Sequence, residues 1–536
     1  MHSILKSQKG NSFWDFFLLF QGVPALCLNT LYFAKFGIVF VNQKLMKKLF
    51  LFFLLLSQSV LMAQTVLNSL PLQLNDPSEN GQILNVEDVK THNVYAFTAD
   101  DQKINILKYN KSLFLTNRYT DSIRSEEDRI LLGYSISEDE NPTLYWSAGN
   151  SRNIRIIKYF LETRKSRALN FDFPPNVDYI ITKFQQQNIF YILAKEKNEP
   201  NLVLFAFNNG VCEIKMFDFS AISMQNHKGQ NFSFTTLLRY HPLQKMDADN
   251  FNSLDKTSSL NKMYLLDGHI ILTLDYNINK TQVLDLNIET GAIQEKNFDK
   301  PISKKPSKTS NSFYNEGKLF QINSNSEEFV FDIKDFETGK TIKNVSVTKN
   351  DTIRFKNSPL FLQTNNSKPQ EIKTTAKFLK NLSGLRGAIS VFKNHQNTYI
   401  TFGGYAEYMA SEFLYSKMDI LDDFISPDMQ SQYLQTKTVF FDAVMNADFE
   451  FVTKQNEPLA IDNIYYYLSI NKNIALENIL KLQDYYILSY YDTALKQFMM
   501  RKFTDGFIDE NPGNPVINKL LLSKPATFGK LKFIEN

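Results

Sequence analysis

Short apolar segments alternate with polar turn clusters along almost all of the chain after about residue 92. Segments such as 94–97 and 202–207 are rich in β-branched and aromatic residues, which favour the pleated, half-buried surface of a strand. Clusters such as 99–101 and 208–210 supply the aspartate, asparagine and glycine that suit turns. This pattern predicts a chain built mainly from short strands joined by tight turns.

Helical periodicity is convincing in only two segments. Residues 374–382 (TTAKFLKNL) place apolar side chains three and four positions apart, and this spacing predicts one short helix. Residues 409–434 form a second helical candidate, which Pro427 would end because proline disfavours helical geometry in the residue before it. Strands therefore dominate the prediction, and we expect an all-β fold.

One two-strand unit recurs along the chain: an apolar strand, a polar turn, and a second strand that ends in an aromatic and an acidic residue. Its clearest copies are 154–173, 202–219, 281–299 and 328–347. Their turns lie about 46, 81 and 48 residues apart, and an apparent insertion at 221–259 accounts for the long interval. A period of roughly 46–48 residues that holds about four strands is typical of a β-propeller blade.

We therefore predict a β-propeller of about seven four-stranded blades, within a range of six to eight, with two partly helical or loop insertions. The insertions are placed at about 221–259 and 405–435. In residues 129–173 the four predicted strands are RILLGYSI, TLYWSA, IRIIKYF and SRALNFDF. Aromatic side chains, 14% of the chain, would fill the wedges between blades. An array of β-sandwiches is the alternative, since no Trp-Asp or Asp-box signature occurs.

Residues 46–63 have the features of a secretory signal peptide. Lys47 and Lys48 precede a short apolar run, and polar residues then lead to Ala63, whose small side chain suits the position before a cut. The apolar run, about eight residues, is well short of the roughly 20 that span a bilayer as a helix. We predict cleavage between Ala63 and Gln64, with an uncleaved membrane anchor as the alternative.

Residues 1–45 precede this signal and show neither helical nor strand periodicity. We interpret them as a translated upstream leader, with Met46 as the true start. The alternative is a membrane-inserted segment at 13–41. Asp15 and Lys35 count against that alternative because charged groups are costly in hydrocarbon.

The predicted mature chain, residues 64–536, is almost neutral and is expected to form a single propeller-like domain. The whole chain carries 59 basic and 56 acidic residues, but residues 1–63 hold six lysines and one aspartate, which leaves 53 basic and 55 acidic residues. This balance excludes a protein that binds nucleic acid by neutralising phosphates. Cys212 would be its only cysteine, so no internal disulfide can form. Its place in an alternating strand predicts a buried, unreactive thiol.

No catalytic signature is present in the predicted mature sequence. Its five histidines lie at positions 92, 227, 241, 269 and 395. None has the spacing of a zinc motif, and neither a GxSxG elbow nor a phosphate-binding glycine loop occurs. Paired glycines at 403–404 more often mark a bulge or a tight approach between sheets. We therefore predict no catalytic residue, no metal and no cofactor.

The insertion 221–259 contains the candidate ligand-binding residues, which are His227, His241, Asp247 and Asp249. The two aspartates open a segment that begins like a calcium-binding loop, in which alternate oxygens converge on the cation. Phe251 then stands at an expected ligand position, and no glycine follows in the sixth place. A solvated loop is therefore preferred over a metal site or a hydrolytic site.

Tyrosine runs at 465–467, 485–486 and 490–491 invite the hypothesis of a carbohydrate-stacking platform. In a strand, however, adjacent side chains point to opposite faces of the sheet. One run cannot then form one platform, and packing in the core and between blades is the preferred interpretation.

These features favour a secreted or cell-envelope binding or scaffold protein over an enzyme, exported to the periplasm, the outer surface or the medium. Its insertions would contact a protein or glycan partner on one rim, since loops on a rigid scaffold commonly carry recognition. We expect a monomer, no nucleic-acid partner, and membrane contact only through an uncleaved N-terminal segment. The alternatives are a secreted hydrolase of polysaccharide or peptide and a membrane-anchored envelope component.

Overall fold

The computed structural model describes residues 64–506, apart from 124–129, 149–152, 226–229, 248–249, 366, 395, 414–429, 454–457 and 484. The chain divides into two units, 1–61 and 62–536, and the second carries every described element. The predicted leader and signal peptide, including Ala63, lie outside the described residues, as do His227, Asp249 and His395.

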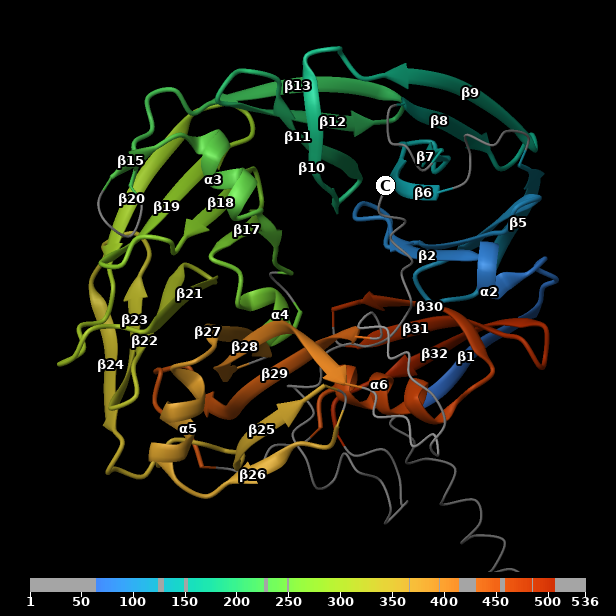
Figure 1. Cartoon of the computed structure of the whole chain (residues 1–536). Helices are drawn as coiled ribbons and strands as arrows, with labels where there is room; N and C mark the ends of the chain where they lie inside the picture. Colours follow the sequence, from blue (N-terminus) through green and yellow to red (C-terminus); the bar gives the residue numbers. More distant parts are fainter. Residues whose placement is uncertain are drawn as a thin grey trace, which may run out of the picture. The chain divides into compact units, whose positions relative to one another are not determined.

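Three four-stranded antiparallel sheets lie between residues 82 and 218 (Figure 1). The first contains β2 (Gln82–Glu87), β3 (Val94–Ala99), β4 (Lys103–Tyr109) and β5 (Leu115–Ser122). The second contains β6 (Ile130–Ile136), β7 (Pro142–Ser147), β8 (Asn153–Phe160) and β9 (Lys165–Asp172). The third contains β10 (Val177–Gln186), β11 (Ile189–Glu196), β12 (Asn201–Asn208) and β13 (Val211–Asp218).

Four more sheets follow, two of them with five strands. The fourth contains β16 (Gln244–Lys245), β17 (Asn261–Leu266), β18 (His269–Leu274), β19 (Lys280–Asn287) and β20 (Ile293–Asp299). The fifth contains β21 (Thr309–Asn315), β22 (Lys318–Ser324), β23 (Glu328–Asp335) and β24 (Thr341–Thr348). The sixth contains, in spatial order, β26 (Gln370–Ile372), β25 (Leu360–Thr364), β29 (Gln430–Met445), β28 (Asn397–Phe413) and β27 (Arg386–Asn394). The seventh contains β1 (Gln64–Pro71), β32 (Gln497–Phe503), β31 (Tyr486–Asp492) and β30 (Ile474–Lys481).

The smaller elements are helices and one two-stranded pair. The helices are α2 (Pro77–Asn80), α3 (Phe234–Tyr240), α4 (Leu254–Thr257), α5 (Thr375–Leu382) and α6 (Ala460–Ile470). The pair is formed by β14 (Met224–Gln225) and β15 (Asn231–Phe232). The predicted insertion 221–259 is therefore partly helical, as expected.

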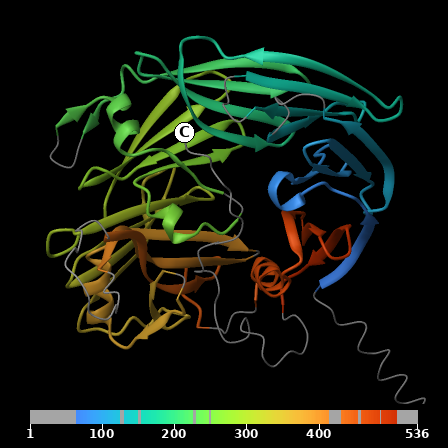
Figure 2. The ribbon, with the colours of Figure 1, turned by 45° about the vertical axis from the view of Figure 1, so that its right-hand side comes forward.

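The two ends of the described chain meet in the seventh sheet, where β1 pairs antiparallel with β32 from Gln64↔Phe503 to Pro71↔Gln497. Figure 2 shows this blue strand beside the red strands of the C-terminal region. The first and seventh sheets also touch, because the backbone N–H of Asn85 donates to the Asn478 side chain at 3.0 Å. The last sheet thus takes a strand from the N-terminal end of the described chain.

Contacts join each sheet to the next and the seventh to the first. Representative contacts, in sheet order, are Tyr95 to Glu140, Tyr145 to Phe190, Gln186 to Leu266, Ser312 to Asp275, Phe331 to Phe402, Asn394 to Asp505 and Asn85 to Asn478. This closed circuit of seven sheets confirms the predicted all-β propeller of about seven blades.

The recurring two-strand unit is confirmed as the last two strands of four consecutive sheets: β8–β9, β12–β13, β19–β20 and β23–β24. Two of its turns repeat one local design. In the first, the Asn287 side chain accepts hydrogen bonds from the backbone N–H groups of Glu289 and Thr290, and Gly291 has a φ of 73°. In the second turn Asp335 accepts a hydrogen bond from the Thr338 backbone N–H, and Gly339 likewise has a positive φ, of 70°. A positive φ favours glycine because it has no Cβ.

Aromatic side chains fill the junctions between sheets, as predicted. Tyr145 of the second sheet stacks on Phe190 of the third, with ring centroids 5.3 Å apart. Tyr264 of the fourth meets Phe313 of the fifth edge to face, also at 5.3 Å. Such pairs bury large apolar areas and add a preferred ring geometry. The high aromatic content is thus explained by packing.

The helix predicted at 374–382 is confirmed as α5, whose N-cap, Thr374, accepts a hydrogen bond from the Lys377 backbone N–H. The helix predicted at 409–434 is wrong over its described residues. Residues 409–413 continue β28 and residues 430–434 belong to β29, paired as far as Phe413↔Gln430. The apolar spacing there was compatible with a helix, but ladder pairing that continues from the sixth sheet outweighs this local preference.

Candidate functional site

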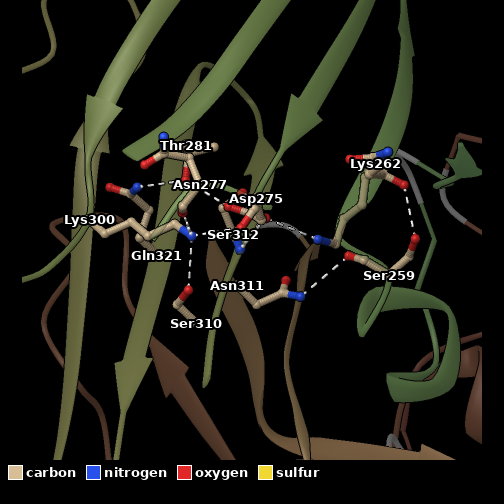
Figure 3. A network of polar contacts seen from close by, with 11 residues as sticks. Ser259, Lys262, Asp275, Asn277, Thr281, Lys300, Ser310, Asn311, Ser312 and Gln321 are labelled. Atoms are coloured by element: carbon tan, nitrogen blue, oxygen red, sulfur yellow. Dashed lines mark hydrogen bonds and ion pairs between the residues drawn. The ribbon is translucent and has the colours of Figure 1, made fainter. Parts of the chain in front are cut away.

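A densely connected polar cluster lies at the junction of the fourth and fifth sheets (Figure 3). Lys262 on β17 and Asp275 at the end of β18 form an ion pair at 3.3 Å, and both side chains are 0% exposed. Asp275 also accepts hydrogen bonds from the Thr281 hydroxyl at 2.7 Å and from the Ser312 backbone N–H at 2.9 Å. The Lys300 ammonium donates to the Asp275 carbonyl oxygen at 2.7 Å. The cluster ties the two sheets together.

The charges of this cluster compensate one another. Burial alone would raise the pKa of the Asp275 carboxyl, but Lys262, Lys300 and the hydroxyl donors hold it below its ordinary value. Burial lowers the pKa of the Lys262 ammonium to about 8, while the attraction of Asp275 opposes that shift. Buried charges are tolerated when they are paired and hydrogen-bonded. Because the cluster is enclosed, its role is structural and no ligand can reach it.

Two further buried acids lie near the N-terminus of α6. Asp442 on β29 is 1% exposed and accepts a hydrogen bond from Thr401 at 2.7 Å. Asp462 in α6 is 5% exposed and accepts one from the Leu459 backbone N–H at 3.1 Å. Burial raises the pKa of each carboxyl to about 7, and Asp462 adds to the effect on Asp442. Such values suit a general acid, but the core encloses both carboxyls, away from any substrate.

Among the described residues, no three histidine, cysteine, aspartate or glutamate side chains converge as a metal site would require. His269 begins β18 and its Nδ1 lies 2.6 Å from a carboxylate oxygen of Asp285 on the neighbouring strand. His241 caps the C-terminal end of α3, and its carbonyl oxygen accepts a hydrogen bond from the Asn261 side chain at 2.5 Å. Both histidines thus have local structural partners.

Asp247 lines a pocket of about 510 Å³ that we call the amide pocket. Two neighbouring hairpin turns and one loop of the insertion form it; its residues are Gln185, Gln186, Gln187, Lys245, Met246, Asp247, Asn250, Leu265, Leu266 and Asp267. The turns come from β10–β11 of the third sheet and β17–β18 of the fourth. Gln186 bridges them by donating to the Leu266 carbonyl oxygen at 2.7 Å.

The loop that carries Asp247 is held by Asn252, which is 2% exposed. The Asn252 side chain accepts from the Asp247 backbone N–H at 2.9 Å and donates to the carbonyl oxygens of Asp247 and Asn250 at 2.8 and 3.0 Å. A side-chain amide thus organises the segment whose sequence begins like a calcium loop. The Asp247 carboxylate lies 3.7 Å from the Lys245 ammonium.

The insertion is more deeply packed than a rim loop. Phe234, Leu237 and Leu238 of α3 belong to the apolar core shared by the third and fourth sheets. Leu254 of α4 packs with Ala388 of the sixth sheet, and α4 lies beside β27 and β28 of that sheet (Figure 1). These buried apolar residues could not be predicted from the sequence, because residues 221–259 are mostly polar. The buried apolar residues fix the position of the loop that borders the amide pocket.

Of the two candidate ligand residues that the structure describes, Asp247 lines the amide pocket and His241 does not. His241 lies at the end of α3 and is not among the pocket residues. His227 and Asp249 lie outside the described residues. Sequence analysis missed Gln185–Gln187 and Asp267, because these residues occupy hairpin turns and their polarity there is ordinary.

Cys212 and the tyrosine runs have structural roles. The predicted burial of Cys212 is found only in part, since the residue is half-buried; burial raises the pKa of its thiol to about 12, which disfavours the reactive thiolate. The run 465–467 lies in α6, so the prediction of a strand there is wrong. Tyr467 meets Tyr490 of β31 with their hydroxyls 2.8 Å apart in the core.

Within the part of the chain that the structure describes, no helix is both long and apolar enough to span a bilayer.

No protein-family model matches the sequence, and no curated protein is significantly similar to it. Among solved structures, the Dos1 propeller is 9% identical, with a TM-score of 0.27 over 82% of this chain and 83% of that one. The WD40 domain of SCAP from fission yeast is 8% identical, with a TM-score of 0.25 over 83% and 92%. A prolyl endopeptidase is 8% identical, with a TM-score of 0.29, and the chain spans only 47% of that protein. The fold assignment therefore rests on the seven connected sheets themselves.

Proposed function

We propose that this protein is an exported, non-enzymatic binding protein whose propeller holds a neutral glycan in the amide pocket. One observation carries the proposal: three consecutive glutamines, Asn250 and two aspartates surround a single pocket of about 510 Å³. Pockets of roughly 300–1,000 Å³ that combine apolar walls with a few polar groups are typical ligand sites.

The lining suits a ligand rich in hydroxyl groups. A carboxamide offers two donors and an acceptor, and an aspartate offers acceptors only. Sugar hydroxyls can pair with both kinds of group. Leu265, Leu266 and Met246 supply the apolar surface that the C–H faces of a sugar require. Lys245 lies beside Asp247 at 3.7 Å, so part of the charge in the pocket is already balanced, which favours a neutral ligand over an ionic one.

The sequence supports export, through the predicted signal peptide at residues 46–63. Cleavage between Ala63 and Gln64 would leave β1 whole, because that strand begins at Gln64. N-terminal sequencing of the native protein tests this part. A first residue at Gln64 supports the proposal, and Met1 in the mature protein contradicts it.

Isothermal titration of the mature protein with a panel of neutral oligosaccharides tests the binding site. We expect saturable binding that the double substitution Asp247→Ala/Asp267→Ala weakens about tenfold, through the loss of roughly 1–2 kcal/mol of hydrogen bonding. Asp172→Ala, at an exposed position on β9, is the matched control and should bind as the unchanged protein does. Wild-type affinity in the double variant would exclude the amide pocket. Release of reducing sugar ends from the same ligands would identify a hydrolase and overturn the non-enzymatic proposal.

A further inference from the structure

A second pocket, of about 590 Å³, lies between α5 and the long hairpin formed by β28 and β29. We call it the lysine pocket, and its residues are Lys377, Lys380, Asn381, Gly384, Leu385, Ala406, Tyr408 and Lys437. Ala406 and Tyr408 belong to the second predicted insertion, 405–435. The pocket therefore places part of that insertion beside a helix encoded about 30 residues earlier.

Helical geometry brings two of the lysines together. Lys377, Lys380 and Asn381 are three and four positions apart, so they share one face of α5. Phe378, Leu379 and Leu382 are buried on the opposite side of the helix. The apolar residues anchor α5 to the sixth sheet and leave the polar face directed to the pocket.

The hairpin supplies the third lysine and an aromatic ring. Lys437 is paired with Ala406 across the ladder, so the two side chains lie on the same face of the sheet. Tyr408, two residues beyond Ala406, shares that face and is 43% exposed.

The described lining of this pocket contains three ammonium groups and no carboxylate. Some surface lysines lie beside an acid, as Lys296 does beside Glu337 at 2.8 Å and Lys318 beside Asp335 at 2.9 Å. Three like charges around one hollow attract an anion and repel a cation.

We propose that the lysine pocket binds an acidic glycan, whose carboxylate is held by the lysines and whose sugar ring lies on Tyr408. The ammonium groups explain selection for a negative charge, and the exposed ring explains selection for a sugar over a small anion, because a flat aromatic face packs against the C–H face of a sugar. This site is separate from the amide pocket and does not depend on the neutral-glycan proposal.

Titration of the mature protein with an oligomer of galacturonic acid, with a neutral oligoglucoside and with inorganic phosphate tests this inference. We expect binding of the oligouronate that weakens as salt is added. Lys377→Gln/Lys380→Gln should reduce its affinity about tenfold or more, since charge-assisted hydrogen bonds are lost. The control Lys165→Gln/Lys340→Gln removes two exposed lysines elsewhere and should bind normally.

Tyr408→Ala distinguishes a glycan from a simple anion. It should weaken the oligouronate about tenfold and leave any phosphate binding unchanged. The proposal fails if the oligouronate does not bind, if the double lysine variant binds it normally, or if Tyr408→Ala has no effect. Binding of the neutral oligoglucoside that survives both sets of changes belongs to the amide pocket, so the two proposals can fail separately.

Discussion

The lysines at the junction of the fourth and fifth sheets differ from those of the lysine pocket in what balances their charge. Lys262 is 0% exposed and pairs with Asp275, which also receives two hydroxyl groups and a backbone N–H. Lys377 and Lys380 are exposed on α5, and the described pocket around them holds no acid. The first arrangement is saturated within the protein, whereas the second leaves its charge available to a ligand.

This difference has a physical cause. An ammonium group loses most of its hydration on burial, so the fold must supply a countercharge and hydrogen-bond acceptors. At the surface, water meets that need, and an unpaired lysine costs little stability. A concentration of unpaired lysines around one hollow therefore affects binding more than folding.

The largest predicted effect comes from removing the countercharge of the buried cluster. Asp275→Ala leaves Lys262 and Lys300 buried without their acid, and we expect a loss of about 3–5 kcal/mol in the free energy of unfolding. Denaturant titration measures it, with Asp172→Ala as the control at an exposed site. A normal unfolding midpoint in Asp275→Ala would show that the cluster is not the brace between sheets that the structure describes.

A smaller effect is expected for a buried acid that has no cation beside it. Burial raises the pKa of Asp442 to about 7 from its ordinary value of 3.8, so between these values the folded state binds more protons than the unfolded state. Stability from this group is present below about pH 4 and is lost progressively as pH rises through 7. Asp442→Asn should remove this loss, so that its advantage over the unchanged protein is larger at pH 8 than at pH 5. Equal differences at both pH values, measured by denaturant titration, would contradict the assignment.

The packing of α5 on β28, next to the lysine pocket, can be changed without altering the charge of the pocket. A Cβ at Gly404 would lie 2.7 Å from a methyl carbon of Leu382 in α5. Gly404→Val should therefore displace α5 and cost about 1–3 kcal/mol, and it should also weaken oligouronate binding. At Gly384, which also borders the pocket, the nearest atom would be 3.7 Å away, so Gly384→Ala is a control for the effect on stability alone. Normal stability and binding in Gly404→Val would show that the packing of α5 against β28 does not determine the shape of the lysine pocket.

The smallest effect on stability should come from the exposed lysines themselves. Lys377→Gln/Lys380→Gln should change the free energy of unfolding by no more than about 0.5 kcal/mol, because both side chains are solvated. Thermal unfolding without ligand measures this. A loss of several kcal/mol would mean that these lysines support the fold, and the contrast between the two lysine groups would then disappear.

Much of the fold could be predicted from local sequence patterns. The four strands expected in residues 129–173 agree with β6, β7, β8 and β9 to within about two residues. The paired glycines do mark a tight approach, but of two helices and not of a second sheet: a Cβ at Gly403 would meet Leu254 of α4 at 3.0 Å, and one at Gly404 would meet Leu382 of α5. Alternation, turn residues and glycine all act over a few neighbouring residues, so one sequence is enough to recognise them.

Helices inside the propeller were harder to predict. Residues 460–470 contain aromatic and β-branched residues that favour strands, yet they form α6. The side chain of Asp462 accepts a hydrogen bond from the Leu459 backbone N–H at the start of the helix, and Tyr467 packs against β31. Packing against a distant strand outweighs the local preference, and that strand cannot be identified from the helix sequence.

The sequence alone determined the strands, the turns, the aromatic junctions and the short helix α5, because each depends on residues that are close along the chain. Tertiary structure decided which turns meet. Gln186 and Leu266 are 80 residues apart, and their contact joins the two sides of the amide pocket. The lysine pocket similarly requires α5 and Lys437 to meet, and closure requires β1 to pair with β32. Such contacts depend on the free energy of the whole set of packed sheets, which no local pattern encodes.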